Sequence, residues 1–390
     1  DRSRIVVMGT GQGGMTALYA AAAEPSFAGA AVLDYFHQRE QAWSEPVDRM
    51  LFGQLLEFGD AELAALVAPR KLLLGYRSGS PLLGTAAREL ARAQEYYRKR
   101  SRGNALSVMK NVADPLLQAA IYLVATDSAG TPGELSFRVP LERVRAARDE
   151  DFESLHAYLL RLVEESEDRR EEYWHNPQPA HMREQLARHE GVPQEPSAPL
   201  RPRTRLVRVT DKWTGYEVLL DVFGGLEVYG HLLVPRGANK GLPAVICQHG
   251  LDGQPKDITG IGEKPRSPYH LFGAALADRG YVVFAPYLTV PAPQGKLIND
   301  LVRRSAPLGM MRTGIEVRKL RAVVDFLSAQ PFVDAKRIGY YGLSYGGYST
   351  LWMGPLEPRL AAIVISGHFN DWRSKITNHE LATSYLMHPD

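Results

Sequence analysis

The chain has 390 residues, which is enough for two or three domains. Its hydrophobic content of 45% and charged content of 23% are ordinary for a globular protein, and a net charge of +2 argues against nucleic-acid binding. The longest apolar runs are too short to cross a membrane, so we expect no membrane partner. The one cysteine, Cys247, excludes an internal disulfide and lies in an apolar run typical of a core strand.

The first third of the chain alternates between short apolar runs and helical patterns. Strands are predicted at residues 5–8, 30–33, 71–75 and 106–109, and helices at residues 15–23, 61–67 and 85–100. Alternation of this type is typical of an α/β domain, in which a mostly parallel sheet has helices on both faces.

A charged segment and a second α/β pattern follow. Residues 141–189 predict two charged helices, and residues 191–202 form a Pro-rich linker. Residues 216–222 and 226–234 alternate like a hairpin turned at Gly224-Gly225. We then expect strands at 244–247, 281–285, 337–341 and 361–365, helices at 269–279, 313–330 and 345–353, and a long loop at 288–311. The predicted domains are residues 1–127, 128–203 and 204–390.

One turn between a predicted strand and a predicted helix carries the motif Gly342-Leu343-Ser344-Tyr345-Gly346. A G-x-S-x-G turn in this setting lifts the serine hydroxyl clear of the sheet, and glycines are needed because side chains there would collide with the strand and helix. The N-terminus of the following helix stabilises developing negative charge. Ser344 is therefore the predicted nucleophile, with Gly342 and Gly346 as the glycines of its turn.

An earlier strand ends in Gln248-His249-Gly250-Leu251. Acyl transfer requires two backbone N–H groups directed at the oxyanion that forms during the reaction. We expect one from Tyr345, which follows the nucleophile, and one from Leu251 in this loop. His249 is predicted to be a structural hydrogen-bonding group, because in this architecture the catalytic histidine follows the serine and the acid in the chain.

These motifs resemble the α/β-hydrolase superfamily, on the side of the acetyl xylan esterases and dienelactone hydrolases. The resemblance covers residues 205–390 and includes Gly280-Tyr281-Val282-Val283 beside the two motifs above. It implies a serine esterase for short-acyl or acetyl esters, including carbohydrate esters, with no metal or organic cofactor. The Ser344 turn also resembles that of prolyl-oligopeptidase-type serine peptidases.

The strand–turn–helix of Ser344 occurs a second time, at an offset of 333 residues. Gly9-Thr10-Gly11-Gln12-Gly13-Gly14 matches it without a gap, so that Gly11 stands where the serine would be. The same offset pairs residues across the two segments: Asp1 with Asp334, Leu18 with Leu351, Glu24 with Glu357, Ala28 with Ala361 and Phe36 with Phe369. We interpret this as a tandem duplication in which the first copy lost its nucleophile.

Residues 1–127 resemble the C-terminal half of the same fold. The family has its acid after the third strand of this half, where this chain has Tyr76-Arg77-Ser78. It has its histidine after the fourth strand, where this chain has Lys110-Asn111. Because nucleophile, acid and base are all missing, the resemblance implies a non-catalytic pseudohydrolase module that acts as a scaffold or binds a glycan or partner.

A different interpretation of the first copy is a dinucleotide site. Gly9-x-Gly11-x-x-Gly14 follows a strand and opens a helix, and Asp34 stands at the next strand end. This arrangement fits phosphate binding at the helix N-terminus and ribose binding by the aspartate. The gap-free match to the Ser344 segment favours the hydrolase interpretation.

Both ends of the chain lack the segments that would complete a domain. We therefore expect a fragment of a longer polypeptide, with the catalytic acid and histidine beyond residue 390 and little activity in the fragment alone. Weaker candidates for acid and base inside the chain are Asp371, His368, His379 and His388. Tyr287 and the loop 288–311 are expected to border the substrate pocket.

Overall fold

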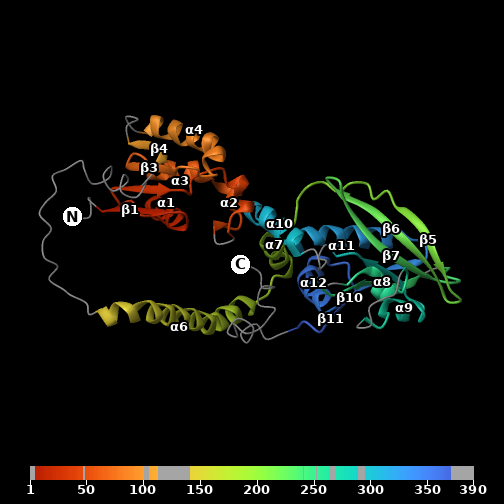
Figure 1. Ribbon diagram of the computed structural model, residues 1–390. Helices are drawn as coiled ribbons and strands as arrows, with labels where there is room; N and C mark the ends of the chain where they lie inside the picture. Colours follow the sequence, from red (N-terminus) through yellow and green to blue (C-terminus); the bar gives the residue numbers. More distant parts are fainter. Residues whose placement is uncertain are drawn as a thin grey trace, which may run out of the picture. The chain divides into compact units, whose positions relative to one another are not determined.

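A computed structural model describes residues 5–46, 49–100, 105–112, 141–239, 241–251, 253–262, 269–288 and 295–369. The chain divides into two compact units (Figure 1). The first comprises residues 1–138 and 303–309, and the second comprises residues 139–302 and 310–390. No helix in the described ranges is long and apolar enough to span a membrane.

The first unit is built on four parallel strands in the order β1-β2-β3-β4. They are β1 (Val6–Thr10), β2 (Gly29–Leu33), β3 (Lys71–Arg77) and β4 (Leu106–Val112). The predicted strands are confirmed: β1 begins one residue later and ends two residues later than predicted, and the other three are extended by one to three residues. The helices of this unit are α1 (Gln12–Ala23), α2 (Gln54–Glu57), α3 (Asp60–Val67) and α4 (Leu83–Arg100), with a 3-10 segment at Arg39–Ser44.

One core holds the first unit together. Helices α1, α3 and α4 place Leu18, Ala64 and Leu90 against Val32 and Leu72 of the sheet. Small residues such as Ala21, Ala61 and Ala93 are fully buried there and let the helices approach the strands closely. Alternate strand residues, including Ala31, Leu33 and Leu73, form a smaller cluster that faces the other way, as the period of two in a strand requires.

The second unit begins with two helices and continues into a seven-stranded sheet. The helices are α6 (Leu141–Trp174) and α7 (Pro179–His189), as the charge pattern predicts. The strand order is β11-β10-β8-β9-β7-β6-β5. The strands are β5 (Arg203–Val209), β6 (Trp213–Phe223), β7 (Leu226–Pro235), β8 (Leu242–Gln248), β9 (Val282–Pro286), β10 (Val333–Leu343) and β11 (Ala362–Ser366).

This sheet is mixed. Strands β5, β6, β7 and β9 pair in antiparallel fashion, and β9, β8, β10 and β11 pair in parallel. The hairpin between β6 and β7 turns at Gly224 and Gly225, whose φ angles are 50° and 84°. A positive φ at both positions suits glycine, and this confirms the predicted hairpin.

The helices of the second unit cover both faces of its sheet. On one face, α11 (Arg312–Ser328) and α12 (Tyr345–Met353) pack on Ile246 and Phe284. On the other, α8 (Pro255–Thr259) and α9 (Phe272–Ala277) pack near Cys247. Neighbouring residues thus serve opposite cores, and burial raises the pKa of the Cys247 thiol, so this residue is an inert part of the core.

Three features of residues 203–311 differ from what the sequence predicts. Strand β5 was not predicted, because all of its residues are exposed and it carries no alternating apolar pattern. The expected loop 288–311 contains α10 (Gly295–Ser305) and a 3-10 turn at Ala306–Leu308. The helix expected at residues 269–279 is shortened to α9, because His270 and Leu271 adopt positive φ angles of 45° and 51°.

Candidate functional site

The order of the strands places a topological switch point at the carboxyl end of the sheet. Strand β8 lies between β9 and β10, so the connection after β8 leads to one face and that after β10 to the other. Side chains placed where neighbouring connections diverge line a natural binding crevice. Ser344 follows β10, and the segment His249-Gly250 follows β8. A Cβ atom at Gly250 would lie only 3.2 Å from the Ser344 Cβ.

Ser344 sits in a strained turn. Its φ and ψ angles are 56° and −116°, a conformation that side chains rarely adopt. Its amide donates to the Ser366 carbonyl of β11 at 2.8 Å, its carbonyl accepts from the Tyr348 amide at 3.0 Å, and its side chain is exposed. These bonds hold the strained backbone in place, so the hydroxyl projects from the end of the sheet.

The glycines around Ser344 are required by close backbone contacts. A Cβ at Gly342 would lie 2.0 Å from the Gly346 carbonyl oxygen. A Cβ at Gly346 would lie 2.4 Å from the carbonyl oxygen of Gln248 and 2.6 Å from that of His249. The start of α12 therefore packs directly on the end of β8, which brings the two predicted motifs together.

His249 is held by the backbone on both sides of its ring. Its Nδ1 lies 2.9 Å from the Gly250 carbonyl oxygen, and its Nε2 accepts from the Leu288 amide at 3.1 Å. This pattern requires a proton on Nδ1 and a lone pair on Nε2. Burial lowers the pKa of the ring, which favours the same neutral form. The geometry is that of the structural group predicted from the sequence.

The two residues predicted to supply the oxyanion amides, Tyr345 and Leu251, lie on different elements. The Tyr345 amide belongs to the first residue of α12. Leu251 is 36% exposed in the loop after β8, and its carbonyl accepts from the Tyr269 hydroxyl at 3.3 Å. Within the described ranges, no backbone carbonyl accepts a hydrogen bond from the Leu251 amide. It is therefore available as a donor.

Of the weaker acid and base candidates, only His368 lies in the described part of the chain. Its ring meets the Tyr348 ring edge to face, with centroids 5.2 Å apart. Asp371, His379 and His388 lie outside the described residues. Among the residues that the structure does describe, no histidine or carboxylate forms a hydrogen bond with the Ser344 hydroxyl.

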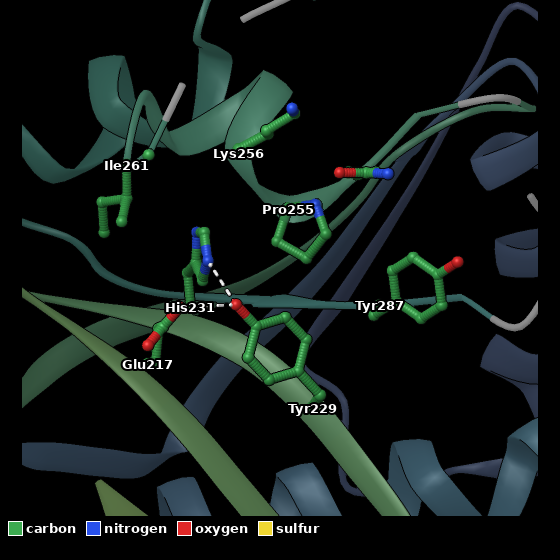
Figure 2. A pocket seen from close by; sticks show the side chains of 9 residues that line it. Glu217, Tyr229, His231, Pro255, Lys256, Ile261 and Tyr287 are labelled. Atoms are coloured by element: carbon green, nitrogen blue, oxygen red, sulfur yellow. Dashed lines mark hydrogen bonds between the residues drawn. The ribbon is translucent and has the colours of Figure 1, made fainter. Parts of the chain in front are cut away.

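A second polar group lies on the β6–β7 hairpin, and the sequence reasoning did not identify it. Glu217, Tyr229 and His231 line a cavity of about 340 Å³ that also includes Lys256 and Tyr287 (Figure 2). The Tyr229 hydroxyl lies 3.0 Å from both Glu217 Oε1 and His231 Nε2. Glu217 pairs with His231 across the two strands, so the alternation of the hairpin could have shown that these residues share a face.

The polar group on the hairpin has fewer hydrogen-bond donors than acceptors. Thr259 donates its hydroxyl proton to the Pro255 carbonyl, so it accepts from His231 Nδ1, 2.8 Å away. Burial lowers the pKa of His231 to about 4, so the ring is neutral near pH 7. Glu217 and the Nε2 of neutral His231 then share the single proton of Tyr229.

The Gly11 turn of the first unit has the same backbone geometry as the Ser344 turn. Gly11 has φ and ψ angles of 56° and −119°. Its amide donates to the Leu33 carbonyl at 2.8 Å, and its carbonyl accepts from the Met15 amide at 3.1 Å. The register of β1 with β2 also repeats that of β10 with β11 at the offset of 333, from Val6 opposite Gly29 to Thr10 opposite Leu33.

Asp34, the residue that would bind the ribose of a dinucleotide, binds Arg77 instead. Both carboxylate oxygens of Asp34 bind Arg77, one through the backbone amide at 3.1 Å and one through Nε at 2.8 Å. Asp34 is only 5% exposed. The order β1-β2-β3-β4 runs in one direction within the described part of this unit, so it has no reversal beside β1 of the kind at which dinucleotides bind. These contacts disfavour the dinucleotide interpretation.

Comparison with known proteins gives a match to one family model and matches to individual proteins. Residues 273–390 match the model of the prolyl oligopeptidase family. Dipeptidyl-peptidase 5 of Porphyromonas gingivalis is 33% identical over 108 residues, which are 27% of this chain and 15% of that protein. YtaP of Bacillus subtilis is 24% identical over 169 residues, 42% of this chain and 54% of YtaP. The chain thus spans only part of the length of both relatives.

Solved structures with a similar fold include two proteins described as acetyl xylan esterases. One, from Bacteroides fragilis, is a candidate esterase with a TM-score of 0.45 and 16% identity, covering 54% of this chain and 58% of that chain. The other, from Paenibacillus sp. R4, has a TM-score of 0.35 and 18% identity, covering 53% and 63%.

The assignment of the second unit rests on its own topology and on the family match. Strands β6 to β11 have the order and direction of an α/β-hydrolase sheet, with the Ser344 turn after β10. The matched residues 273–390 include this turn. The second unit of the chain therefore has the α/β-hydrolase fold.

Proposed function

We propose that the protein is a serine hydrolase that cleaves short-acyl carboxylic esters, with Ser344 as the nucleophile. The observation that supports this most directly is the strained, exposed conformation of Ser344 beside the end of β8. Ser344 attacks the ester carbonyl, and the amides of Tyr345 and Leu251 bind the oxyanion. The N-terminus of α12 adds to that stabilisation.

The proton of Ser344 requires a base. In this proposal a histidine and an acid beyond residue 390 complete the triad, as the resemblance implies. His249 is not that base, because its Nδ1 and Nε2 both engage the backbone. Acetyl or other short-acyl esters of small molecules or carbohydrates are the proposed substrates, and the reaction requires no metal or organic cofactor.

The test uses the full-length polypeptide and a fluorophosphonate probe that labels activated serines. Ser344→Ala should abolish labelling and lower the turnover of 4-nitrophenyl acetate by roughly three orders of magnitude. Ser349→Ala is the matched control, because Ser349 lies on α12 with its hydroxyl bound to the Tyr345 carbonyl. Undiminished labelling in Ser344→Ala would contradict the proposal.

A peptidase is the second candidate, and the match of residues 273–390 to the prolyl oligopeptidase family favours it. The same Ser344 turn would then attack an amide carbonyl. Dipeptidyl 4-nitroanilides distinguish the two activities, because only a peptidase releases 4-nitroaniline from them efficiently. Hydrolysis of such anilides that depends on Ser344 and exceeds ester hydrolysis would replace the esterase proposal.

For the first unit we propose a degenerate hydrolase copy with a non-catalytic role. The support is the shared offset of 333 in sequence, in strand register and in the conformation of Gly11. Gly11 has no hydroxyl, and β3 and β4 lead into Arg77 and Lys110-Asn111, not into an acid and a histidine.

A further inference from the structure

Arg312 is a buried cation beside the residue that follows the proposed nucleophile. It is the first residue of α11 and is only 7% exposed. One of its terminal nitrogens, Nη2, donates to the hydroxyl of Tyr345. Its guanidinium carbon lies 5.0 Å from the centroid of the Tyr345 ring. Arg312 therefore contacts the side chain of the residue that follows Ser344.

Within the described ranges, the other terminal nitrogen of Arg312 has no hydrogen-bond acceptor. Nη1 is a buried atom without a partner, although it carries two N–H donors. Two buried carboxylates that bind other residues of α11 engage groups different from Arg312. Glu190 accepts from the Thr313 hydroxyl, and Glu316 pairs with Lys319 at 2.9 Å. Among the described residues, Arg312 forms no ion pair.

The guanidinium of Arg312 lacks a full set of hydrogen-bond acceptors and a negatively charged partner among the described residues. A buried charge is ordinarily paired, and a buried donor without an acceptor lowers stability. The planar fork of an arginine suits the two oxygens of a carboxylate, which can accept two parallel hydrogen bonds. A tyrosine hydroxyl supplies one acceptor and no negative charge, so the site retains both a free donor and an uncompensated cation.

Resting on the proposed ester hydrolysis, we propose that Arg312 is a specificity-determining residue that binds a carboxylate of the substrate. The preferred esters then carry a carboxylate within reach of Ser344, on either the acyl or the alcohol side. The Tyr345 side chain contacts the guanidinium through both its ring and its hydroxyl and so holds it in place.

The first experiment compares matched esters in the full-length polypeptide. On the alcohol side, 4-acetoxybenzoate is compared with 4-acetoxybenzamide. On the acyl side, 4-nitrophenyl hydrogen adipate is compared with 4-nitrophenyl hexanoate. One carboxylate ester should show a roughly tenfold or larger advantage in kcat/KM over its neutral partner. The pair that shows it identifies the side. Equal values in both pairs would overturn the inference without any mutant.

Variants then assign the preference. Arg312→Met should abolish the preference in kcat/KM for the charged over the neutral ester. Arg312→Lys should retain part of this preference, because lysine keeps the positive charge but not the planar fork of the guanidinium. Arg318→Met is the control. Arg318 is also 7% exposed on α11, and its terminal nitrogens donate to Pro193 and Ser197. A preference that survives in Arg312→Met would assign the carboxylate to another group and overturn the inference.

A binding experiment separates this inference from the proposed reaction. In the Ser344→Ala background, calorimetry should detect benzoate or adipate binding that weakens roughly tenfold or more on Arg312→Met. Such binding in a protein with no Ser344-dependent turnover of any ester would support the inference and contradict the hydrolase proposal. Ester turnover without carboxylate binding would do the reverse.

Discussion

The turns at Ser344 and Gly11 have nearly the same backbone and different surroundings. Their φ and ψ angles agree within a few degrees, and each is held by matching bonds from a neighbouring strand. They differ in what lies against the glycine two residues after the centre of each turn, which is Gly346 in one and Gly13 in the other. At Gly346 a Cβ would collide with the Gln248 carbonyl oxygen at 2.4 Å, whereas at Gly13 nothing lies within 4 Å.

This difference shows that the conformation of the turn alone does not distinguish the candidate site at Ser344 from the turn at Gly11. The strand, the turn and the helix are sufficient for the strained conformation, because both segments have it. The surroundings of Ser344 need a further strand, β8, whose end packs on the start of α12 and leads into the loop that we propose for the oxyanion. In the described part of the first unit, no strand occupies that place beside β1.

The largest expected effect comes from testing the two glycines in parallel. Gly346→Ala should lower the free energy of unfolding of the second unit by roughly 3 kcal/mol or more, because the backbone carbonyls of Gln248 and His249, at and just after the end of β8, must move. Gly13→Ala should stabilise the first unit by about 0.5–1 kcal/mol, because alanine favours the helix and meets no neighbour.

Hydrogen exchange measured by mass spectrometry reads the two turns separately in one molecule. Peptides from β10 and α12 should lose protection in Gly346→Ala, and peptides from β1 and α1 should gain it in Gly13→Ala. Equal responses at the two turns would mean that β8 does not set the difference.

The second prediction concerns the stability of the second unit in acid. It uses His231 on the β6–β7 hairpin, and the described sheet of the first unit has no such hairpin. The pKa of His231 is lowered in the folded chain to about 4, from about 6.5 when unfolded. The stabilising effect of the neutral ring is therefore complete above pH 6.5 and lost as the pH falls toward 4. Between pH 7 and 4.5 the loss should be roughly 2 kcal/mol.

Urea unfolding of wild type and His231→Gln at the two pH values checks this. The glutamine variant should lose less stability on acidification, because it has no ring to protonate in the unfolded state. The same pH dependence in both proteins would show that His231 is not the responsible group.

The smallest effect is expected at Gly11. Gly11→Ser should cost about 1 kcal/mol, since serine must adopt a φ of 56° and a Cβ there would lie 3.1 Å from Arg49 Nη2, the movable end of a side chain. No second labelled serine should appear, because a hydroxyl without a base remains weakly nucleophilic. Ser344 in the same chain is the positive control for the fluorophosphonate. Labelling and turnover at residue 11 would contradict the pseudohydrolase proposal.

Much of the architecture could be predicted from local patterns. The strands of the first unit, the hairpin at Gly224-Gly225 and the structural role of His249 follow from apolar periodicity, turn chemistry and chain order. Strand β5 and helix α10 could not be predicted, because an exposed edge strand has no alternating core face and the charged segment at α10 follows a Pro-rich stretch that suggests a loop.

The sequence by itself determined the two strand–turn–helix segments, because glycine placement and strand–helix alternation act between near neighbours. Only the tertiary structure decided which side chains meet. Tyr345 and Arg312 are 33 residues apart, and their contact depends on how α11 and α12 pack on the same face of the sheet. Glu217 and His231 meet through strand register. Such contacts depend on strand order and helix rotation, which summed burial over the whole unit selects and no local pattern encodes.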